Sequence, residues 1–399
     1  MTMTPTIPDL PHYGFDPEYQ SIYDMAFRYA REELYELCGR MDDDEWFPER
    51  EFRAMHSHGL LGTTIAPEFG GPGLDVLAQC FICEALAYWN HAVSASFLAS
   101  DNLCIHNLTR NANESQTEQY FPRFCSGEAI GALGMTEPGA GSDALGSMAT
   151  TARRDGDDYV LNGRKLFITN GPVADVLLVY AKTAPERGNK GISAFIVENT
   201  FEGFSVAQKL DKMGWRGSPT GELLFDNCRV PAGNLVGEEN GGAGIMMSGL
   251  DIERTIGAFY CLGMTQRALD LSVEQANTRQ QFGKTIGNFQ MVQAILADMY
   301  TDIETMRALT YQVGREILLV PAGEGGRGEI HKRSAAAVLH AGRASMRVLD
   351  NAVQLHGGMG FMRESEVNRL YRSGKVMEIG AGTNQVRQMI IAGELLKGG

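Results

Sequence analysis

The spacing of hydrophobic residues changes twice along the 399 residues of the chain. Up to about residue 125, apolar residues recur at every third or fourth position, as they do on one face of a helix. After Gly127 the apolar stretches become short and β-rich, and from Gly249 onward the helical spacing returns. The chain is therefore predicted to be an α+β protein with a helical domain at 1–127, a middle antiparallel β domain at 128–243 and a helical bundle at 244–399.

Helix signals dominate the first block. A helix is predicted from Asp16-Pro17 to about Met41, because its apolar residues share one face and a proline stands just inside the start. A second helix is expected after Phe47-Pro48, with further helical stretches at 75–98 and around 111–124.

The middle block is punctuated by turn residues. The pair Asn162-Gly163 stands between two β-rich arms, which predicts a hairpin turn at that pair. Short strands are predicted at 176–183, 193–198, 204–206 and 223–230. This pattern favours antiparallel pairing over alternating strand–helix units.

Two long apolar stripes fill the last block. The first runs over 289–317, a break follows at 321–328, and the second runs over 330–355 until Gly357-Gly358 stops it. Long helices joined by short connections predict an antiparallel bundle. His356, at the end of the second helix, is expected to cap or pack because no nucleophile motif accompanies it.

The segment 247–254 follows a glycine-rich turn and is read as a helix start. Ser248 and Asp251 fit a capping box in which Asp replaces the usual Glu. Glu253 is the candidate catalytic carboxylate of this segment. The simpler alternative is that Asp251 and Glu253 only offset the helix dipole, as acids in a first turn often do.

Two loops have the composition of ligand-binding sites. Residues 135–143 combine small residues, which let a ligand approach the backbone, with two hydroxyls. Gly139, Gly141 and Ala144 match the relaxed dinucleotide fingerprint, but the expected hairpin behind them is not the parallel βαβ unit that this fingerprint needs. Residues 167–170 add an aromatic ring and a hydroxyl, suited to a flat ring with polar edges.

Charge and cysteine content exclude other classes of function. The formal net charge of −14 argues against non-specific nucleic-acid binding. The 7 cysteines follow no secretory signal, and residues 1–11 lack the arginines of a transit peptide, so a reducing cytoplasm is expected. Cys80 and Cys83 have no matching second pair and are predicted to pack in the core. No apolar run is long enough to span a bilayer, and no metal-ligand spacing is present.

Five motifs together resemble the flavin-contacting set of the acyl-CoA dehydrogenase family, in that family's order and at its spacing. They are residues 135–143, 167–170, 279–284, 354–360 and 380–385. Within the family, residues 210–214, 247–254 and 378–383 are most similar to the isovaleryl-CoA dehydrogenases. Two departures are visible: Phe167 stands where the family usually has Trp, and Asn384-Gln385 replaces Ser-Glu.

The resemblance implies an acyl-CoA dehydrogenase-like fold whose C-terminal domain is a four-helix bundle, assembled as a homotetramer with FAD. Electrons would pass to an electron-transfer flavoprotein. The implied cofactor-binding residues of the subunit's own site are Met135, Thr136, Gly141, Ser142, Phe167, Ile168, Thr169, Thr383 and Gln385. Phe282 also belongs to the cofactor set, and the FAD of a neighbouring subunit would be reached by Arg279, Gln290, Gln354, Leu355, Gly357 and Gly358.

The resemblance also offers two places for the base that removes the α proton of the acyl-CoA substrate. Most family members carry Glu where this chain has Ala381, whereas the isovaleryl branch places its base where this chain has Glu253. Glu253 is therefore expected to be catalytic, with Glu378 as the fallback. The substrate-binding residues would be Leu103, Ser142, Asp251, Ile252, Glu253, Arg254, Gly380 and Ala381.

The small residues at 380 and 381 open room for a methyl branch, so isovaleryl-CoA is the favoured substrate. Three alternatives stay open at this point. They are a longer β-methyl acyl-CoA of the citronellyl type, an acyl-CoA oxidase or flavin monooxygenase on the same fold, and a scaffold that binds acyl-CoA without chemistry. The last would need the base to be absent, and Glu253 argues against it.

Overall fold

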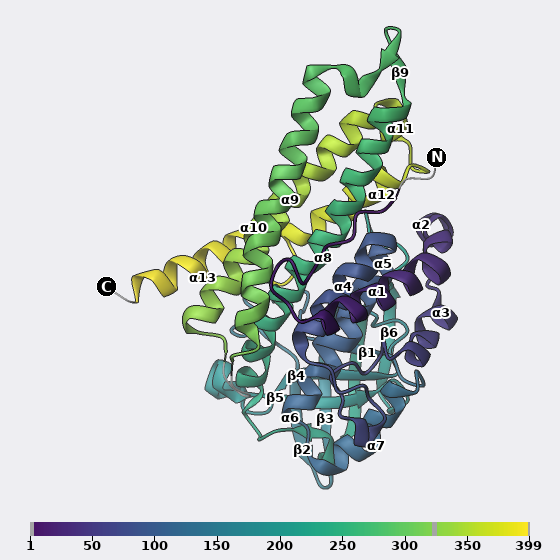
Figure 1. The fold of residues 1–399 in the computed structure, drawn as a ribbon. Coiled ribbons are helices and arrows are strands. Elements are labelled where there is room, and N and C mark those ends of the chain that lie inside the picture. Colours follow the sequence, from purple (N-terminus) through teal and green to yellow (C-terminus); the bar gives the residue numbers. More distant parts are fainter. Residues whose placement is uncertain (1–3, 321–324, 398–399) are drawn as a thin grey trace.

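The structure, a computed structural model, describes residues 4–320 and 325–397. Figure 1 shows a sheet at one end, a group of helices beside it, and the long helices of the C-terminal part, which extend away from both. The predicted order of helical, β and helical parts is confirmed. Within the described residues, no helix is long and apolar enough to cross a membrane, and no group of three or more His, Cys, Asp or Glu side chains is placed to hold a metal ion.

The first predicted helix is confirmed. α1 (Pro17–Tyr29) begins behind Asp16, whose side chain accepts a hydrogen bond from the Glu18 N–H. The helical path continues without a loop to Asp44, through η1 (Ala30–Leu34), η2 (Tyr35–Leu37) and α2 (Cys38–Asp44). The rest of this part consists of α3 (Glu49–Ala54), η3 (Met55–His58), η4 (Pro67–Phe69), α4 (Val76–Trp89), α5 (His91–Phe97), η5 (Leu98–His106), α6 (Asn107–Asn111) and α7 (Glu114–Cys125).

α4 is the central helix of this part, because every one of its residues is buried. It packs against α1 and against α8 (Gly242–Thr278) of the C-terminal bundle. Cys80 and Cys83 are fully buried free thiols, and burial raises the pKa of Cys83 to about 12. Their predicted role as core residues is confirmed.

An eight-stranded sheet forms the middle part, in the order β6-β7-β3-β2-β4-β5-β8, with β1 paired to β4. Antiparallel pairing dominates as predicted, but β1 and one end of β2 run parallel to β4. The strands are β1 (Gly131–Gly134), β2 (Thr151–Asp155), β3 (Asp158–Thr169), β4 (Val176–Lys182), β5 (Ile192–Glu198), β6 (Phe204–Lys209), β7 (Thr220–Pro231) and β8 (Leu235–Val236). The short helices η6 (Pro185–Gly191) and η7 (Ala232–Asn234) lie in its connections.

The predicted hairpin turn at Asn162-Gly163 is wrong. β3 runs straight through this pair, since Asn162 pairs with Thr151 of β2 and Gly163 with Phe225 of β7. The register shifts at Gly163, which has φ +152° and lies so close to Thr150 that a Cβ would sit 2.4 Å from the hydroxyl oxygen. Glycine at this position therefore allows a β-bulge and the close contact with Thr150. The hairpin turn lies at 155–158 instead.

The C-terminal part is built on α8 (Gly242–Thr278), α9 (Gln290–Ile317) and α10 (Gly328–His356), which pack against one another. Both predicted apolar stripes are helices, and α10 ends at His356, followed by the cap residue Gly357 with φ +59°. His356 Nδ1 lies 2.8 Å from the Ala352 oxygen, in agreement with a local packing role. Of the predicted break at 321–328, residues 321–324 lie outside the described residues.

Shorter elements complete this part. A two-stranded ribbon, β9 (Gln280–Gln281) with β10 (Lys284–Thr285), and η8 (Ile286–Asn288) join α8 to α9. α11 (Gly358–Phe361), α12 (Glu366–Gly374), η9 (Lys375–Glu378) and α13 (Asn384–Leu396) follow α10. Both α12 and α13 pack on α10.

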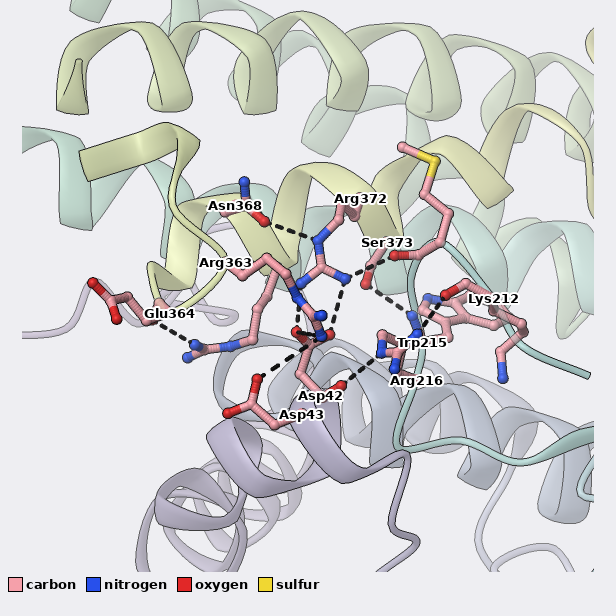
Figure 2. A network of polar contacts seen from close by, with 12 residues as sticks. Asp42, Asp43, Lys212, Trp215, Arg216, Arg363, Glu364, Asn368, Arg372 and Ser373 are labelled. Atoms are coloured by element: carbon pink, nitrogen blue, oxygen red, sulfur yellow. Dashed lines mark hydrogen bonds and ion pairs between the residues drawn. The ribbon is translucent and has the colours of Figure 1, made fainter. Parts of the chain in front are cut away.

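One polar network joins all three parts (Figure 2). Arg372 of α12 donates to both carboxylate oxygens of Asp42 in α2, at 3.0 and 2.5 Å. It also donates to the backbone oxygen of Met213, in the loop between β6 and β7, at 2.7 Å. The Trp215 N–H of that loop donates to the Ser373 hydroxyl at 3.0 Å. These bonds connect the loop between β6 and β7 to α12, and α12 to α2.

Candidate functional site

The helix that carries Glu253 begins earlier than the sequence suggested. α8 starts at Gly242, behind Gly241, so Ser248 and Asp251 lie inside the helix. The Ser248 hydroxyl donates to the Ile245 oxygen and caps nothing. The predicted capping box and the dipole alternative are therefore both wrong. Gly242 is needed at the helix start because α8 meets β5 there: a Cβ on Gly242 would lie 2.7 Å from the Ser193 carbonyl carbon.

Asp251 instead connects α8 to the start of α10. Its Oδ2 accepts the Gly326 N–H at 2.6 Å, and its Oδ1 lies 2.6 Å from His331 Nδ1 and 3.2 Å from Arg254 Nη1. Asp251, Arg254 and His331 are all buried. The sequence analysis missed His331, because a lone histidine distant in sequence carries no local signal.

A turn between η9 and α13 brings Ala381 to α8. Arg254 Nε donates to the Ala381 oxygen at 3.4 Å. Ala381 has φ +54°, which is a left-handed conformation. The fully buried side chain of Arg387 binds the backbone that precedes Ala381. Arg387 donates to the oxygens of Gly380 and Met377, at 2.5 and 2.6 Å. Arg254, the residue that follows Glu253, thus contacts the turn that carries Ala381.

Glu253 has the electrostatic character of a base. Its Oε2 is buried and has no hydrogen-bond partner among the described residues. Burial raises the pKa of Glu253 to about 7, against the opposing charges of Arg254 and Arg387. A carboxylate of this kind can accept a proton near neutral pH and has no competing hydrogen bond at that oxygen.

The predicted pocket wall, Leu103, lies on η5 beside α8. Asn107, one turn further on, donates to the Leu103 oxygen at 2.9 Å. The Asn107 side chain lies against Gly249, where a Cβ would be 2.5 Å from its Oδ1. Gly249 precedes Glu253 by one helical turn, so η5 and α6 line the same stretch of α8. Ile252 points elsewhere, into a small apolar cluster with Val76.

The loop at 135–149 lies beside β3, and many of its residues are exposed. The Thr136 oxygen accepts the Leu166 N–H at 2.8 Å, which holds the loop along the strand. A Cβ at Gly139 or Gly141 would meet no described atom within 4 Å. Phe167, with φ +62°, is 65% exposed beside this loop. Small residues in open space next to an exposed aromatic face fit a flat heterocycle with a phosphate tail.

The other residues predicted for the subunit's own cofactor site differ in their exposure to solvent. Met135, Thr136 and Thr169 are half-buried, whereas Ser142 and Gln385 are exposed. Ile168 is buried in the sheet core, so only its backbone is available. The Thr383 hydroxyl accepts the Val386 N–H and caps α13.

The remaining predicted cofactor residues gather at the other end of the molecule. Figure 1 shows β9 and α11 at the end of the bundle that is remote from the sheet. The exposed residues there are Arg279, Phe282, Gln290, Gln354, Gly357 and Gly358, while Leu355 is buried in the bundle core. Phe282 is 92% exposed with φ +53°. Within one chain these residues do not meet the loop at 135–149.

Comparison with known proteins shows which family the three parts of the chain match. The acyl-CoA dehydrogenase N-terminal, middle and C-terminal domains match residues 16–128, 132–228 and 240–396. Isovaleryl-CoA dehydrogenase, mitochondrial, from Solanum tuberosum is 42% identical over 386 residues, 96% of this chain and 92% of that protein. The short-chain specific acyl-CoA dehydrogenase of Clostridium acetobutylicum is 36% identical, over 96% of this chain and 100% of that protein.

Among solved structures, butyryl-CoA dehydrogenase from Megasphaera elsdenii superposes with a TM-score of 0.89 at 34% identity, covering 99% of this chain and 100% of that chain. The relatives thus span several acyl substrates on one fold.

Proposed function

Because the chain belongs to the acyl-CoA dehydrogenase family, we propose that it oxidises a short branched acyl-CoA, with isovaleryl-CoA favoured, to the 2-enoyl-CoA. Oxidation of acyl-CoA is the activity of the family, so the chain is an oxidoreductase. The choice of a branched substrate and of the base is specific to our proposal. It is supported by the likeness to isovaleryl-CoA dehydrogenases and by the absence of a carboxylate at Ala381.

Glu253 is proposed to remove the α proton. The single observation that carries this assignment is its buried Oε2, which has no hydrogen-bond partner in the described parts of the chain. A C–H bond next to a thioester is a weak acid, so the base must be close, oriented and shielded from water. The Asp251–His331 contact and the Arg254 bond to Ala381 hold that turn of α8 in place.

Family members are FAD-dependent flavoproteins, and the open loop beside Phe167 fits that cofactor. When bound, FAD would accept hydride from the β carbon of the substrate. We propose that Thr136, Ser142, Phe167 and Thr169, with Thr383 and Gln385 nearby, hold the flavin and its pyrophosphate. The family passes its electrons to an electron-transfer flavoprotein, and we propose the same acceptor for this chain.

A homotetramer is part of the proposal. The residues at the remote end of the bundle, Arg279, Phe282 and Gln290 among them, are exposed and are proposed to reach the FAD of a neighbouring subunit. Covering an aromatic side chain as exposed as Phe282 with a partner subunit would remove apolar surface from water, which favours association. A cytoplasmic location stays a prediction, since the name of the potato relative includes the word mitochondrial.

The proposed base gives a pH dependence with a definite sign. Glu253 accepts a proton only when it is ionised, and burial raises its pKa to about 7. Flavin reduction at limiting isovaleryl-CoA is therefore expected to rise with pH and level off about one unit above that value. The measurement is the initial rate of flavin bleaching in stopped flow across pH. A rate that stays constant through neutrality would contradict a base with this pKa.

Substrate choice is tested by comparing isovaleryl-, isobutyryl-, butyryl-, octanoyl- and citronellyl-CoA. Gly380 and Ala381 leave room beside the α and β carbons, so isovaleryl-CoA is expected to bleach the flavin with the highest kcat/KM. One methyl group in an apolar pocket changes kcat/KM by roughly 10- to 200-fold. A preference for the straight chains would refute the branched substrate. Rapid peroxide release from the reduced protein would instead favour an oxidase or a monooxygenase.

A further inference from the structure

The loop at 135–149 carries proposed ligand contacts but contains neither helix nor strand. Its internal hydrogen bonds are local: Glu137 and Ala140 exchange backbone bonds at 3.2 and 3.1 Å, and Asp143 accepts bonds from Gly146 and Ser147 a few residues further on. A loop of this length with so little regular structure needs another restraint if it is to present Thr136 and Ser142 in a fixed position.

A buried ion pair supplies that restraint. The Glu137 carboxylate accepts the N–H groups of Ala149 and Thr150, at 2.6 and 3.0 Å, and the Lys165 ammonium at 2.7 Å. Lys165 also donates to the Met135 oxygen at 3.2 Å. Both ends of the loop therefore bond to the same ion pair, whose Lys165 member belongs to β3.

The pair is buried on both sides, with side-chain exposures of 3% for Glu137 and 0% for Lys165. Burial alone would raise the pKa of Glu137, but the Lys165 charge and the N–H donors hold the pKa below its ordinary value. Burial lowers the pKa of Lys165 to about 8 against the attraction of Glu137. A buried ion pair adds little net stability compared with apolar side chains of the same size, so its value lies in the geometry that it enforces.

That geometry concerns the proposed flavin site. Lys165 stands two residues before Phe167 on β3, and the Leu166 N–H between them donates to the Thr136 oxygen at 2.8 Å. The ion pair and this bond together set the distance from the open glycines of the loop to the exposed Phe167 ring.

We propose that the Glu137–Lys165 pair is a positioning device that fixes the loop at 135–149 against β3 and thereby sets the affinity of the chain for FAD. The inference rests on the proposed cofactor. Neither side chain needs to touch the flavin, because both are buried beneath the loop that would hold it.

The test is a titration of apoprotein with FAD, followed by quenching of flavin fluorescence. Lys165→Met and Glu137→Gln are each expected to weaken FAD binding by roughly 10- to 100-fold, as the loss of a charged hydrogen bond would. The double variant is expected to be no weaker than the worse single variant, because both changes break one unit. Arg229→Met is the matched control, since it breaks an exposed pair with Asp158 in the same sheet, at 2.8 Å.

Urea unfolding of the apoproteins separates positioning from general stability. Weaker FAD binding by Glu137→Gln, with an unfolding midpoint close to that of the wild type, supports the proposal. FAD affinity equal to that of the wild type in either folded variant overturns it. If Lys165→Met does not fold, Glu137→Gln alone decides, because the amide keeps the size of the carboxylate. FAD binding by the wild-type protein is measured first. If the wild type binds no FAD, the proposed cofactor itself is refuted, independently of the variants.

Discussion

Replacing Glu253 with Gln is expected to slow flavin reduction by isovaleryl-CoA by roughly 100- to 10,000-fold, the usual contribution of a general base. The amide has the size of the carboxylate but cannot accept the α proton. FAD binding and substrate binding are expected to stay near those of the wild type, because no described residue bonds Oε2. Single-turnover stopped flow under anaerobic conditions measures this rate directly.

Glu378→Gln is the control for this experiment. Glu378 is the nearest other carboxylate to Ala381 in the sequence, but Lys375 and Asn384 already bind it, at 2.5 and 3.1 Å. Its loss is expected to leave flavin reduction within a few-fold of the wild type. Normal reduction by Glu253→Gln combined with a large loss in Glu378→Gln would transfer the role of base to Glu378.

Arg387→Met is expected to destabilise the protein by about 2–4 kcal/mol, because buried oxygens lose their donor. Arg387 is fully buried and donates to the backbone oxygens of Met377 and Gly380 and to the side chain of Asn384. The free energy of unfolding in urea measures the loss. Arg343→Met, an exposed position on α10, is the control and is expected to change stability by less than about 0.5 kcal/mol.

The same substitution tests the electrostatics of the base. The positive charge of Arg387 lowers the pKa of Glu253, which burial alone would raise further. Removing that charge is expected to move the pH profile of flavin reduction to higher pH, so that the variant is slowest relative to wild type in mild acid. The variant is assayed as folded protein in the absence of urea. A profile identical to that of the wild type would mean that Arg387 does not influence the base.

Errors in the sequence interpretation came from motifs read without their surroundings. Ser248 and Asp251 have the spacing of a capping box, but α8 extends back to Gly242, where it meets Ser193 of β5. Asn162-Gly163 has the composition of a hairpin turn, but the pair lies within a continuous strand. In both cases the glycine was interpreted as the end of a helix or strand. In the structure, another segment of the chain packs so closely against the glycine that a larger residue would not fit.

The sequence by itself determined the order of the three parts, the open composition of the loop at 135–149 and the lack of a carboxylate at Ala381. These properties depend on the identity and spacing of residues, which are local. Only the tertiary structure placed His331 and Arg387 near the turn of α8 that carries Glu253. It also buried the Oε2 oxygen of Glu253 and left that oxygen without a hydrogen-bond partner among the described residues. The reason is physical: the proton affinity of a carboxylate depends on the water and charge around it, and folding alone decides both.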